Sequence, residues 1–143
     1  REDMFSSRVA SYNDNVLIGT TATTEDSNFD QGHPLYRTIS ALAAIRRAHP
    51  ALMRGRQVVR DYAQAPGLFS VSRFDPETDV EYFIAFNSAD HPIEVNSTIG
   101  GGTRALEALS GPCPTTTSAP GSVRVTLPAF GWMVCRTTES YQP

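Results

Sequence analysis

Residues 32–52 read GHPLYRTISALAAIRRAHPAL, and this stretch separates two kinds of sequence. Pro34 suits the first position of a helix, where a backbone N–H has no partner within the helix. Pro50 disfavours helical geometry at the residue before it. Between them, apolar side chains recur at helical spacing and form one stripe, at Leu35, Ile39, Leu42 and Ala43. The stretch therefore predicts one α-helix over residues 34–48, with a His-Pro pair at each end.

After this helix the hydrophobic pattern takes the period of strands. Short apolar or alternating segments follow one another, separated by clusters of Gly, Pro, Asn and Asp. The segments are QVVRDYA (57–63), LFSVSRF (68–74), VEYFIAFN (80–87), PIEVNS (92–97), TRALEAL (103–109), SVRVTL (122–127) and GWMVCRT (131–137). Strands of this length and spacing are typical of an antiparallel β-sandwich. The fifth segment also fits a turn of helix.

The residues before the helix are polar and predict a long surface loop. A loop and one helix cannot bury an apolar stripe by themselves. We therefore expect residues 1–55 to be the end of one domain and residues 56–143 to be a mainly β domain with its own core. The helix stripe is expected to cover a surface outside this chain.

The composition is that of an ordinary globular protein. The 143 residues are 40% hydrophobic and 19% charged, and the formal net charge is −3. No apolar run reaches the roughly 20 residues of a membrane span. All 12 basic residues are arginine and they are scattered, so no basic stripe indicates nucleic acid. Neither a membrane nor a nucleic acid is expected as a partner.

The two cysteines, Cys113 and Cys135, are too few and too far apart for a zinc site built from two CxxC pairs. They are a candidate disulfide, which would fit an exported protein. Two buried free thiols are the alternative, because spacing alone does not fix pairing.

The histidines and acidic clusters have simpler explanations than metal binding. His33 and His49 are 16 residues apart, whereas a metal pair on one helix face needs a spacing of four. DSNFDQG (26–32) begins like a calcium loop, but Gln31 and Arg37 stand where a glycine and a glutamate are required. The acids of DPETDVE (75–81) fit a hairpin tip. No metal or cofactor is expected on this chain.

Taken in order, these features resemble the α-amylase family of glycoside hydrolases. FDQGHPLYRTISALAAIRRAHPALMRG (29–55) is similar to the family's HPLY–R–LxxLR–HPAL–G segment, the last helix of its (β/α)8 barrel. A C-terminal β-sandwich follows that helix in the family. Its landmarks are similar to SR (72–73), FN (86–87) and LPAFGWMV (127–134). The resemblance implies a Greek-key-like antiparallel sandwich, preceded by a long loop and one helix that closes a barrel absent from this chain.

The same resemblance implies a function for the parent protein. REDMF (1–5) resembles a segment of the loop after the eighth barrel strand, at the catalytic face. Arg1 and Asp3 are accordingly candidate substrate-binding residues, acting through the missing barrel. The parent would cleave or transfer α-glucosidic linkages of an α-glucan or sucrose-like substrate with retention, which requires two carboxylates about 5–5.5 Å apart.

In the family those carboxylates precede the segment that this chain resembles. The acids before the helix match none of the catalytic motifs: Glu2, Asp3, Glu25 and Asp26. The chain is therefore expected to have no catalytic residue and no cofactor, and the resemblance allows for calcium in the parent barrel. Its expected partner is the rest of that barrel, which the sandwich supports structurally.

Two other interpretations stay open. A carbohydrate-binding module would need exposed aromatic rings in a row on one sheet. The candidate rings are expected to point mostly inward: Tyr62, Phe69, Phe74, Tyr82, Phe130 and Trp132, the last with core packing as its expected role. A free-standing interaction sandwich would leave the apolar stripe of the helix unexplained.

Overall fold

The computed structural model describes residues 5–13 and 16–140. The chain divides into two compact units, Arg1–Ile45 and Arg46–Pro143. The first contains the long loop, a short 3-10 helix at Ala10–Tyr12 and most of α1 (Pro34–Ala48). The second contains the sandwich. The assignment of residues 1–55 to a barrel and of 56–143 to a separate domain stays a prediction.

Helix α1 forms over the range that the sequence predicts. Arg46 and Arg47 lie in its last turn, where positive charge suits the partial negative charge of a helix C-terminus. No described side chain of α1 is buried. Leu35 is 51% exposed and Ile39 is 66% exposed, whereas Leu42 and Ala43 are half-buried, so the first half of the apolar stripe is exposed among the described residues.

A second, one-turn helix follows Pro50 and was not predicted: α2 (Ala51–Arg54). Gly55 ends this helix where other backbone atoms come close to its Cα. A Cβ at this position would lie 2.5 Å from the carbonyl oxygens of both Ala51 and Phe74. Its φ of −63° is open to any residue, so the glycine is required for space and not for a left-handed turn.

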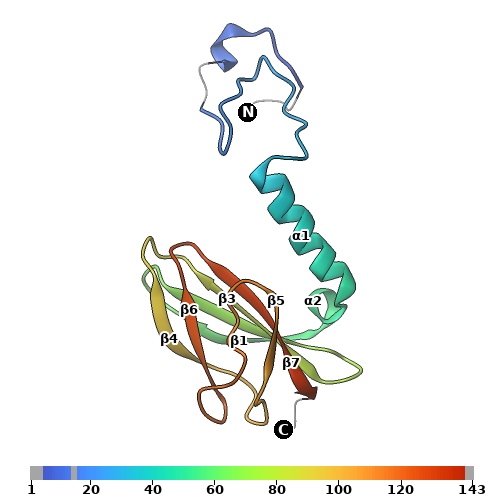
Figure 1. The fold of residues 1–143 in the computed structure, drawn as a ribbon, viewed down its shortest axis with the longest axis vertical. Coiled ribbons are helices and arrows are strands. Elements are labelled where there is room, and N and C mark those ends of the chain that lie inside the picture. Colours follow the sequence, from blue (N-terminus) through green and yellow to red (C-terminus); the bar gives the residue numbers. More distant parts are fainter. Residues whose placement is uncertain (1–4, 14–15, 141–143) are drawn as a thin grey trace. The chain divides into compact units, whose positions relative to one another are not determined.

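Seven strands build the sandwich (Figure 1). They are β1 (Arg56–Tyr62), β2 (Leu68–Phe74), β3 (Val80–Asn87), β4 (Ile93–Thr98), β5 (Leu106–Ser110), β6 (Ser122–Leu127) and β7 (Trp132–Ser140). All pairings are antiparallel, in a five-stranded sheet of order β1-β2-β3-β7-β5 and a two-stranded sheet β4-β6. The segment at 103–109 is a strand and not a helical turn. The predicted class, a mainly β antiparallel sandwich after a long loop and one main helix, is confirmed.

The core lies between the two sheets. Alternate residues of β3 and β7 face β6, since side chains of a strand point to opposite faces in turn. The cluster consists of Phe83, Ala85, Ile99, Leu106, Val123, Val125, Leu127, Met133 and Cys135. The largest of these, Phe83, is completely buried on the central strand β3.

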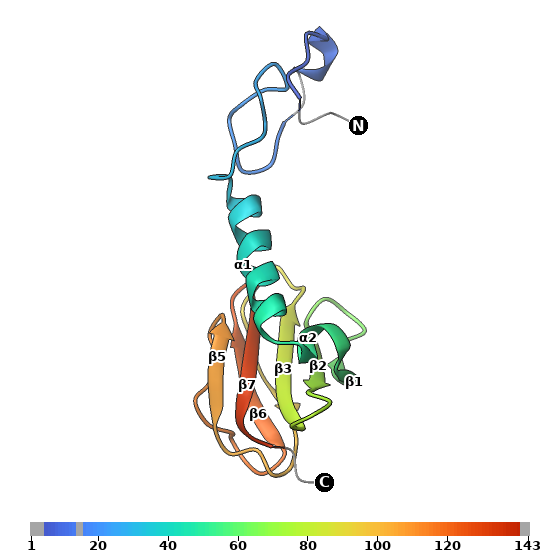
Figure 2. The same ribbon diagram turned by 90° about the vertical axis from the view of Figure 1, so that its right-hand side faces the viewer.

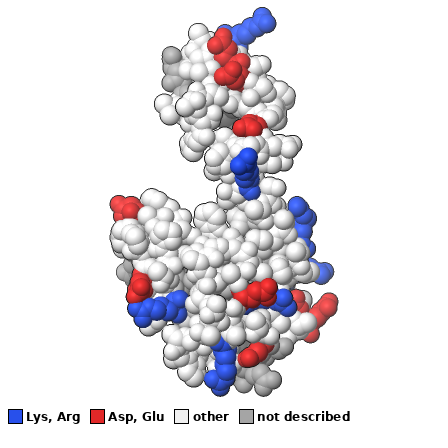
Figure 3. Space-filling model, viewed as in Figure 1, with Lys and Arg blue, Asp and Glu red and all other residues white. Residues whose placement is uncertain are grey.

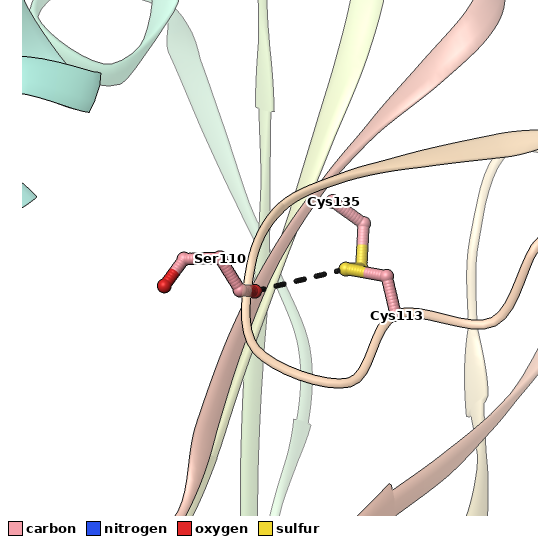
Figure 4. Close-up of a disulfide and its surroundings, with 3 residues drawn as sticks. All are labelled: Ser110, Cys113 and Cys135. Carbon is pink, nitrogen blue, oxygen red and sulfur yellow. Dashed lines mark hydrogen bonds between the residues drawn. A yellow bond between two sulfur atoms is a disulfide. The ribbon is translucent and has the colours of Figure 1, made fainter.

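A disulfide joins Cys113 to Cys135 at the edge of this core (Figure 4). Cys135 is on β7, and Cys113 lies in the loop after β5, with 5.8 Å between their Cα atoms. The Cys113 sulfur is 3.9 Å from the Ser110 carbonyl oxygen. This is a contact and not a hydrogen bond, because a disulfide sulfur carries no proton.

The disulfide is expected to stabilise the sandwich by closing a loop of sequence separation 22. Loop-closure entropy of that size corresponds to about 3 kcal/mol. Urea unfolding of the 143-residue chain should therefore show a lower midpoint after reduction, and Cys113→Ala should reproduce that loss without reductant. Equal midpoints for the oxidised and reduced chains would contradict the expectation.

Candidate functional site: the outer face of the five-stranded sheet

The substrate-binding candidates Arg1 and Asp3 lie outside the described residues. Of the described residues, no three or more His, Cys, Asp or Glu gather as a group able to hold a metal ion. No described helix is long and apolar enough to cross a membrane.

The two histidines of the His-Pro pairs have separate hydrogen-bond partners. In the first unit, the ring of His33 lies between the Ile18 carbonyl oxygen and the Leu35 amide. In the second unit, His49 Nδ1 lies 3.2 Å from the Tyr82 hydroxyl. Burial raises the pKa of Tyr82, so this hydroxyl keeps its proton at neutral pH. Each imidazole thus fixes a local contact at one end of α1.

The acids of the β2–β3 hairpin serve the turn. Asp75 Oδ1 accepts hydrogen bonds from the amides of Glu77 and Thr78, each at 3.0 Å. The Glu77 amide bond is the main reason why the pKa of Asp75 lies below its usual value. This use of an Asp side chain is an ordinary feature of tight turns.

A buried ion pair was not anticipated from the sequence. Glu81, on β3, is completely buried, and its Oε1 lies 2.7 Å from Arg60 Nη2. The same oxygen accepts a short hydrogen bond from Ser72, and Oε2 accepts one from the Gly100 amide at 2.8 Å. One carboxylate therefore ties β1, β2 and β3 to the turn that follows β4.

A second carboxylate links the two sheets nearby. Asp61 Oδ2 accepts hydrogen bonds from the hydroxyls of Ser70 and Ser97 and from the Thr98 amide. Ser97 and Thr98 belong to β4, whereas Asp61 and Ser70 belong to the five-stranded sheet. The hydrogen-bond donors of both carboxylates thus come from the sandwich itself, so both carboxylates have a structural role.

The short landmarks of the β part also have structural roles. Arg73 Nη1 donates a hydrogen bond to the Gly55 carbonyl oxygen at 3.0 Å. Asn87 Nδ2 donates to the carbonyl oxygens of His91 and Pro128, each at 2.8 Å. Asn87 thereby joins the loop after β3 to the loop before β7. Spacing alone could not assign these roles, because the partners are distant in sequence.

The outer face of the five-stranded sheet carries a row of aromatic rings. Cross-strand pairing places four of them side by side on β1, β2, β3 and β7: Tyr62, Phe69, Phe86 and Trp132. Phe69 and Phe86 are stacked, with ring centroids 6.3 Å apart and ring planes at 23°. Exposure is 75% for Tyr62, 40% for Phe69 and 44% for Phe86. Figure 2 shows these strands side by side in the sheet.

A row of aliphatic side chains runs beside the rings. Pairing places Val59, Val71, Ile84 and Val134 across the same four strands on the same face. Val71 and Val134 are buried, while Val59 is half exposed at the edge. The one-turn helix α2 contacts β2 within this unit. The outer face therefore presents two adjoining apolar rows that are partly uncovered among the described residues.

The expectation that the aromatic rings point mostly inward is wrong, although two of the six candidates are buried, Phe74 and Tyr82. Tyr62 and Phe69 are exposed on the outer face, and Phe130 is exposed in the loop before β7. Trp132 belongs to the outer row and not to the core, although core packing was expected for it. The register decides this: the odd-numbered residues of β3 and β7 face the core, so Phe86 and Trp132 face away.

Two N–H donors on the outer face of β7 are buried without a hydrogen-bond acceptor among the described residues. They are Trp132 Nε1 and Arg136 Nε. Buried donors are normally paired in folded proteins, so these two call for an acceptor. On the face drawn in Figure 3, charged side chains of both signs are scattered.

This geometry defines a class of protein segment: a β-sandwich with a partly uncovered apolar outer face, preceded by a loop and a helix whose apolar stripe is partly exposed. An α-amylase of Streptomyces lividans is 40% identical over 137 residues, which are 95% of this chain and 15% of that protein. Over this length the chain is homologous to a part of that α-amylase. No family model matches the chain.

Solved structures point the same way. A debranching enzyme of Nostoc punctiforme superposes with a TM-score of 0.60 and 26% identity, over 77% of this chain and 21% of that chain. A trehalulose synthase mutant superposes with a TM-score of 0.57 and 20% identity, over 76% of this chain and 19% of its own. The second similarity concerns the fold alone. In each case the chain spans a minor share of its relative.

Removal of the Glu81 charge should destabilise the sandwich. Glu81→Gln leaves the Arg60 guanidinium, whose side chain is 16% exposed, without its carboxylate. We expect a loss of about 2–3 kcal/mol, below the full cost for a buried pair because Arg60 reaches solvent. Urea unfolding of the variant and of the original chain measures this loss in the free energy of unfolding.

Asp90→Asn is the matched control, because Asp90 pairs with His91 on the surface. It should leave the urea midpoint essentially unchanged, because a fully exposed ion pair is screened by solvent. Equal losses in the two variants would show that the buried pair contributes no more than an exposed one.

Proposed function

We propose that this chain is the non-catalytic C-terminal portion of a retaining α-amylase-like glycoside hydrolase or glucanotransferase. The parent acts on α-glucosidic linkages of an α-glucan or sucrose-like substrate. The sandwich supports the catalytic barrel by packing the outer face of its five-stranded sheet against it. The observation that carries this proposal is the pair of adjoining apolar rows on that face.

The area and chemistry of the face support a protein partner. Two rows of four apolar side chains cross β1, β2, β3 and β7, and exposed rings in them would gain from burial at about 25 cal/mol per Å². The chain spans 15% of the α-amylase that it matches, so a parent of that kind has ample sequence to cover the face. The outer layer of a (β/α)8 barrel consists of helices, and this layer is the surface against which the sandwich would pack.

The unpaired donors on β7 make the proposed partner more specific. Trp132 Nε1 and Arg136 Nε flank the aliphatic Val134 on the outer face. A docked barrel would need acceptors near both, such as carbonyl oxygens at a helix end. The exposed stripe of α1 would be covered by the same barrel as its last helix.

The chemistry of the described residues supports a non-catalytic role. Retaining hydrolysis needs one carboxylate free to attack and one acid free to give a proton. Asp61 and Glu81 each hold three hydrogen-bond partners of the sandwich and line its interior. Asp75 is committed to its turn. Catalysis is accordingly assigned to parts of the parent outside this chain.

A second candidate function is sugar binding on the aromatic row. The stacked and half-exposed Phe69 and Phe86 favour it, because flat exposed rings can stack against sugar faces. The neighbouring row weakens it: the side chains beside the rings are Val71 and Ile84, which offer no hydrogen bond to a hydroxyl. Binding sites for polar ligands usually combine apolar contact with a few placed polar groups.

The first test is turnover. The 143-residue chain alone should release no reducing sugar from starch or maltooligosaccharides, and no glucose or fructose from sucrose, because the two carboxylates of retaining hydrolysis are assigned to the parent outside this chain. Turnover by the pure chain at a rate above buffer would overturn the proposed role.

The second test is docking. Phe69→Ser with Phe86→Ser should lower the thermal midpoint of the full-length parent by several degrees, since a loss of about 1–2 kcal/mol is expected for exposed rings buried at an interface. In the 143-residue chain the same change should cost about 1 kcal/mol or less, because both rings are already partly exposed.

Val95→Ser is the matched control, because Val95 is an exposed apolar residue on the other sheet. It should affect parent and isolated chain alike. Equal effects of the Phe double variant in parent and isolated chain would contradict docking. Maltoheptaose binding by the isolated chain that the double variant abolishes would favour the second candidate.

A further inference from the structure

The turn that leads into β7 carries an aromatic ring on an unusual backbone conformation. Phe130 has a φ of +54°, in the left-handed region that bulky side chains rarely adopt. This conformation is unfavourable for most residues other than glycine, asparagine and aspartate. Core packing does not account for the ring, because Phe130 is 67% exposed. The turn therefore presents an aromatic side chain at a position where a smaller or more polar residue would suit the fold better.

Hydrogen bonds hold this turn in place. The Phe130 amide donates to the Ala89 carbonyl oxygen at 3.1 Å, and the Gly131 amide donates to that of Pro128 at 3.0 Å. The Gly131 carbonyl oxygen accepts from the Asn87 amide at 2.8 Å. Backbone strain persists where the surrounding structure fixes it, and such positions cluster at binding sites. Because the turn is already ordered, little backbone freedom would be lost when a ligand binds.

Polar side chains lie beside this turn, on the loop after β3. The Asn87 side chain joins the two segments, since its Nδ2 donates to the carbonyl oxygens of His91 and Pro128, each at 2.8 Å. Asp90 follows the residue that accepts from the Phe130 amide. Its Oδ1 lies 3.0 Å from His91 Nδ1, and its side chain is 86% exposed. The second carboxylate oxygen can accept from a hydroxyl group.

We propose that this end of the sandwich binds α-glucan, with the Phe130 ring stacked on a glucose unit and with Asp90 and His91 bound to its hydroxyls. A pyranose has apolar C–H faces, which pack on an aromatic ring, and a rim of hydroxyl groups. A large apolar ring beside a few placed polar groups matches that combination. The choice of α-glucan rests on the substrate class proposed for the parent.

A sugar suits this surface better than a docked barrel helix does. An apolar helix face packed on Phe130 would take Asp90 and His91 out of water, which is unfavourable for charged or polar groups without new partners. Sugar hydroxyls would supply such partners. The outer sheet face differs, because Val71 and Ile84 lie beside its rings. The sheet face is therefore assigned to the barrel, and the end turn is assigned to sugar.

Two substitutions separate the ring from the backbone conformation. Phe130→Tyr keeps the ring, whereas Phe130→Asn removes it and supplies a residue that adopts positive φ more easily. In the 143-residue chain, Phe130→Asn should leave the urea midpoint unchanged or raise it. A clearly lower midpoint would show that the ring packs as part of the fold, and it would overturn the proposal.

Binding is measured by nuclear magnetic resonance of the 143-residue chain during titration with maltoheptaose. We expect shifts in the amide signals of residues 88–91 and 130–131. Phe130→Asn should weaken binding about ten-fold, as expected for the loss of one aromatic contact, and Phe130→Tyr should bind like the original chain. Cellohexaose tests the linkage, because its straight β-linked chain suits a flat row of rings and not a single ring on a turn. Equal binding of the two sugars would overturn the assignment to α-glucan.

The double substitution Phe69→Ser with Phe86→Ser is the matched control, because both rings lie on the outer sheet face. It should leave maltoheptaose binding unchanged. Shifts confined to the outer strands and lost in this double variant would overturn the proposal in favour of the aromatic row. An absence of shifts with maltoheptaose would also overturn it. None of these readouts involves the barrel, so their failure would leave the proposed docking, which is tested in the parent, unaffected.

Discussion

The burial of Phe83, Met133 and Leu127 between the two sheets is the interaction on which the sandwich depends. Phe83 on β3 and Met133 on β7 belong to the five-stranded sheet and Leu127 on β6 to the two-stranded sheet, so the three side chains meet only when the two sheets stack. The disulfide fixes the loop after β5 to the same layer. Glu81 and Asp61 connect β1, β2, β3 and β4 through partly buried hydrogen bonds. Apolar burial between the sheets supplies most of the stabilisation.

The core accounts for the apolar side chains on one face of the five-stranded sheet, but not for those on the other face. Strand β3, VEYFIAFN, is apolar on both sides, as strands covered on both faces are. Its core side is filled by this chain. Its outer side carries Ile84 and Phe86, which continue across β2 and β7 as two apolar rows. The α-amylase-family relationship gives these rows a reason, since the chain matches a minor part of a larger protein. A face left uncovered by one part of a protein is a natural place for another part to pack.

The two His-Pro pairs at the ends of α1 show what local sequence can and cannot predict. Proline positions were enough to place the helix over residues 34–48, and the structure confirms it. They could not reveal what the histidines do. His33 meets Ile18 and His49 meets Tyr82, and neither contact follows from spacing along one helix. The one-turn helix after Pro50 was also missed, because four residues are too few for a periodic pattern.

The sequence by itself determined the period of the long helix and of most strands, and with it the sandwich class and the resemblance to one family. It did so because helix and strand periods are local properties that proline and glycine interrupt. The tertiary structure alone decided which face of each strand is inside. Core packing was expected for Trp132, but the strand register places both Trp132 and Phe86 on the outer face. The Arg60–Glu81 pair, the Asp61 bridge and the Cys113–Cys135 bond likewise depend on strands separated in sequence, and their distances are fixed only when the sheets pack.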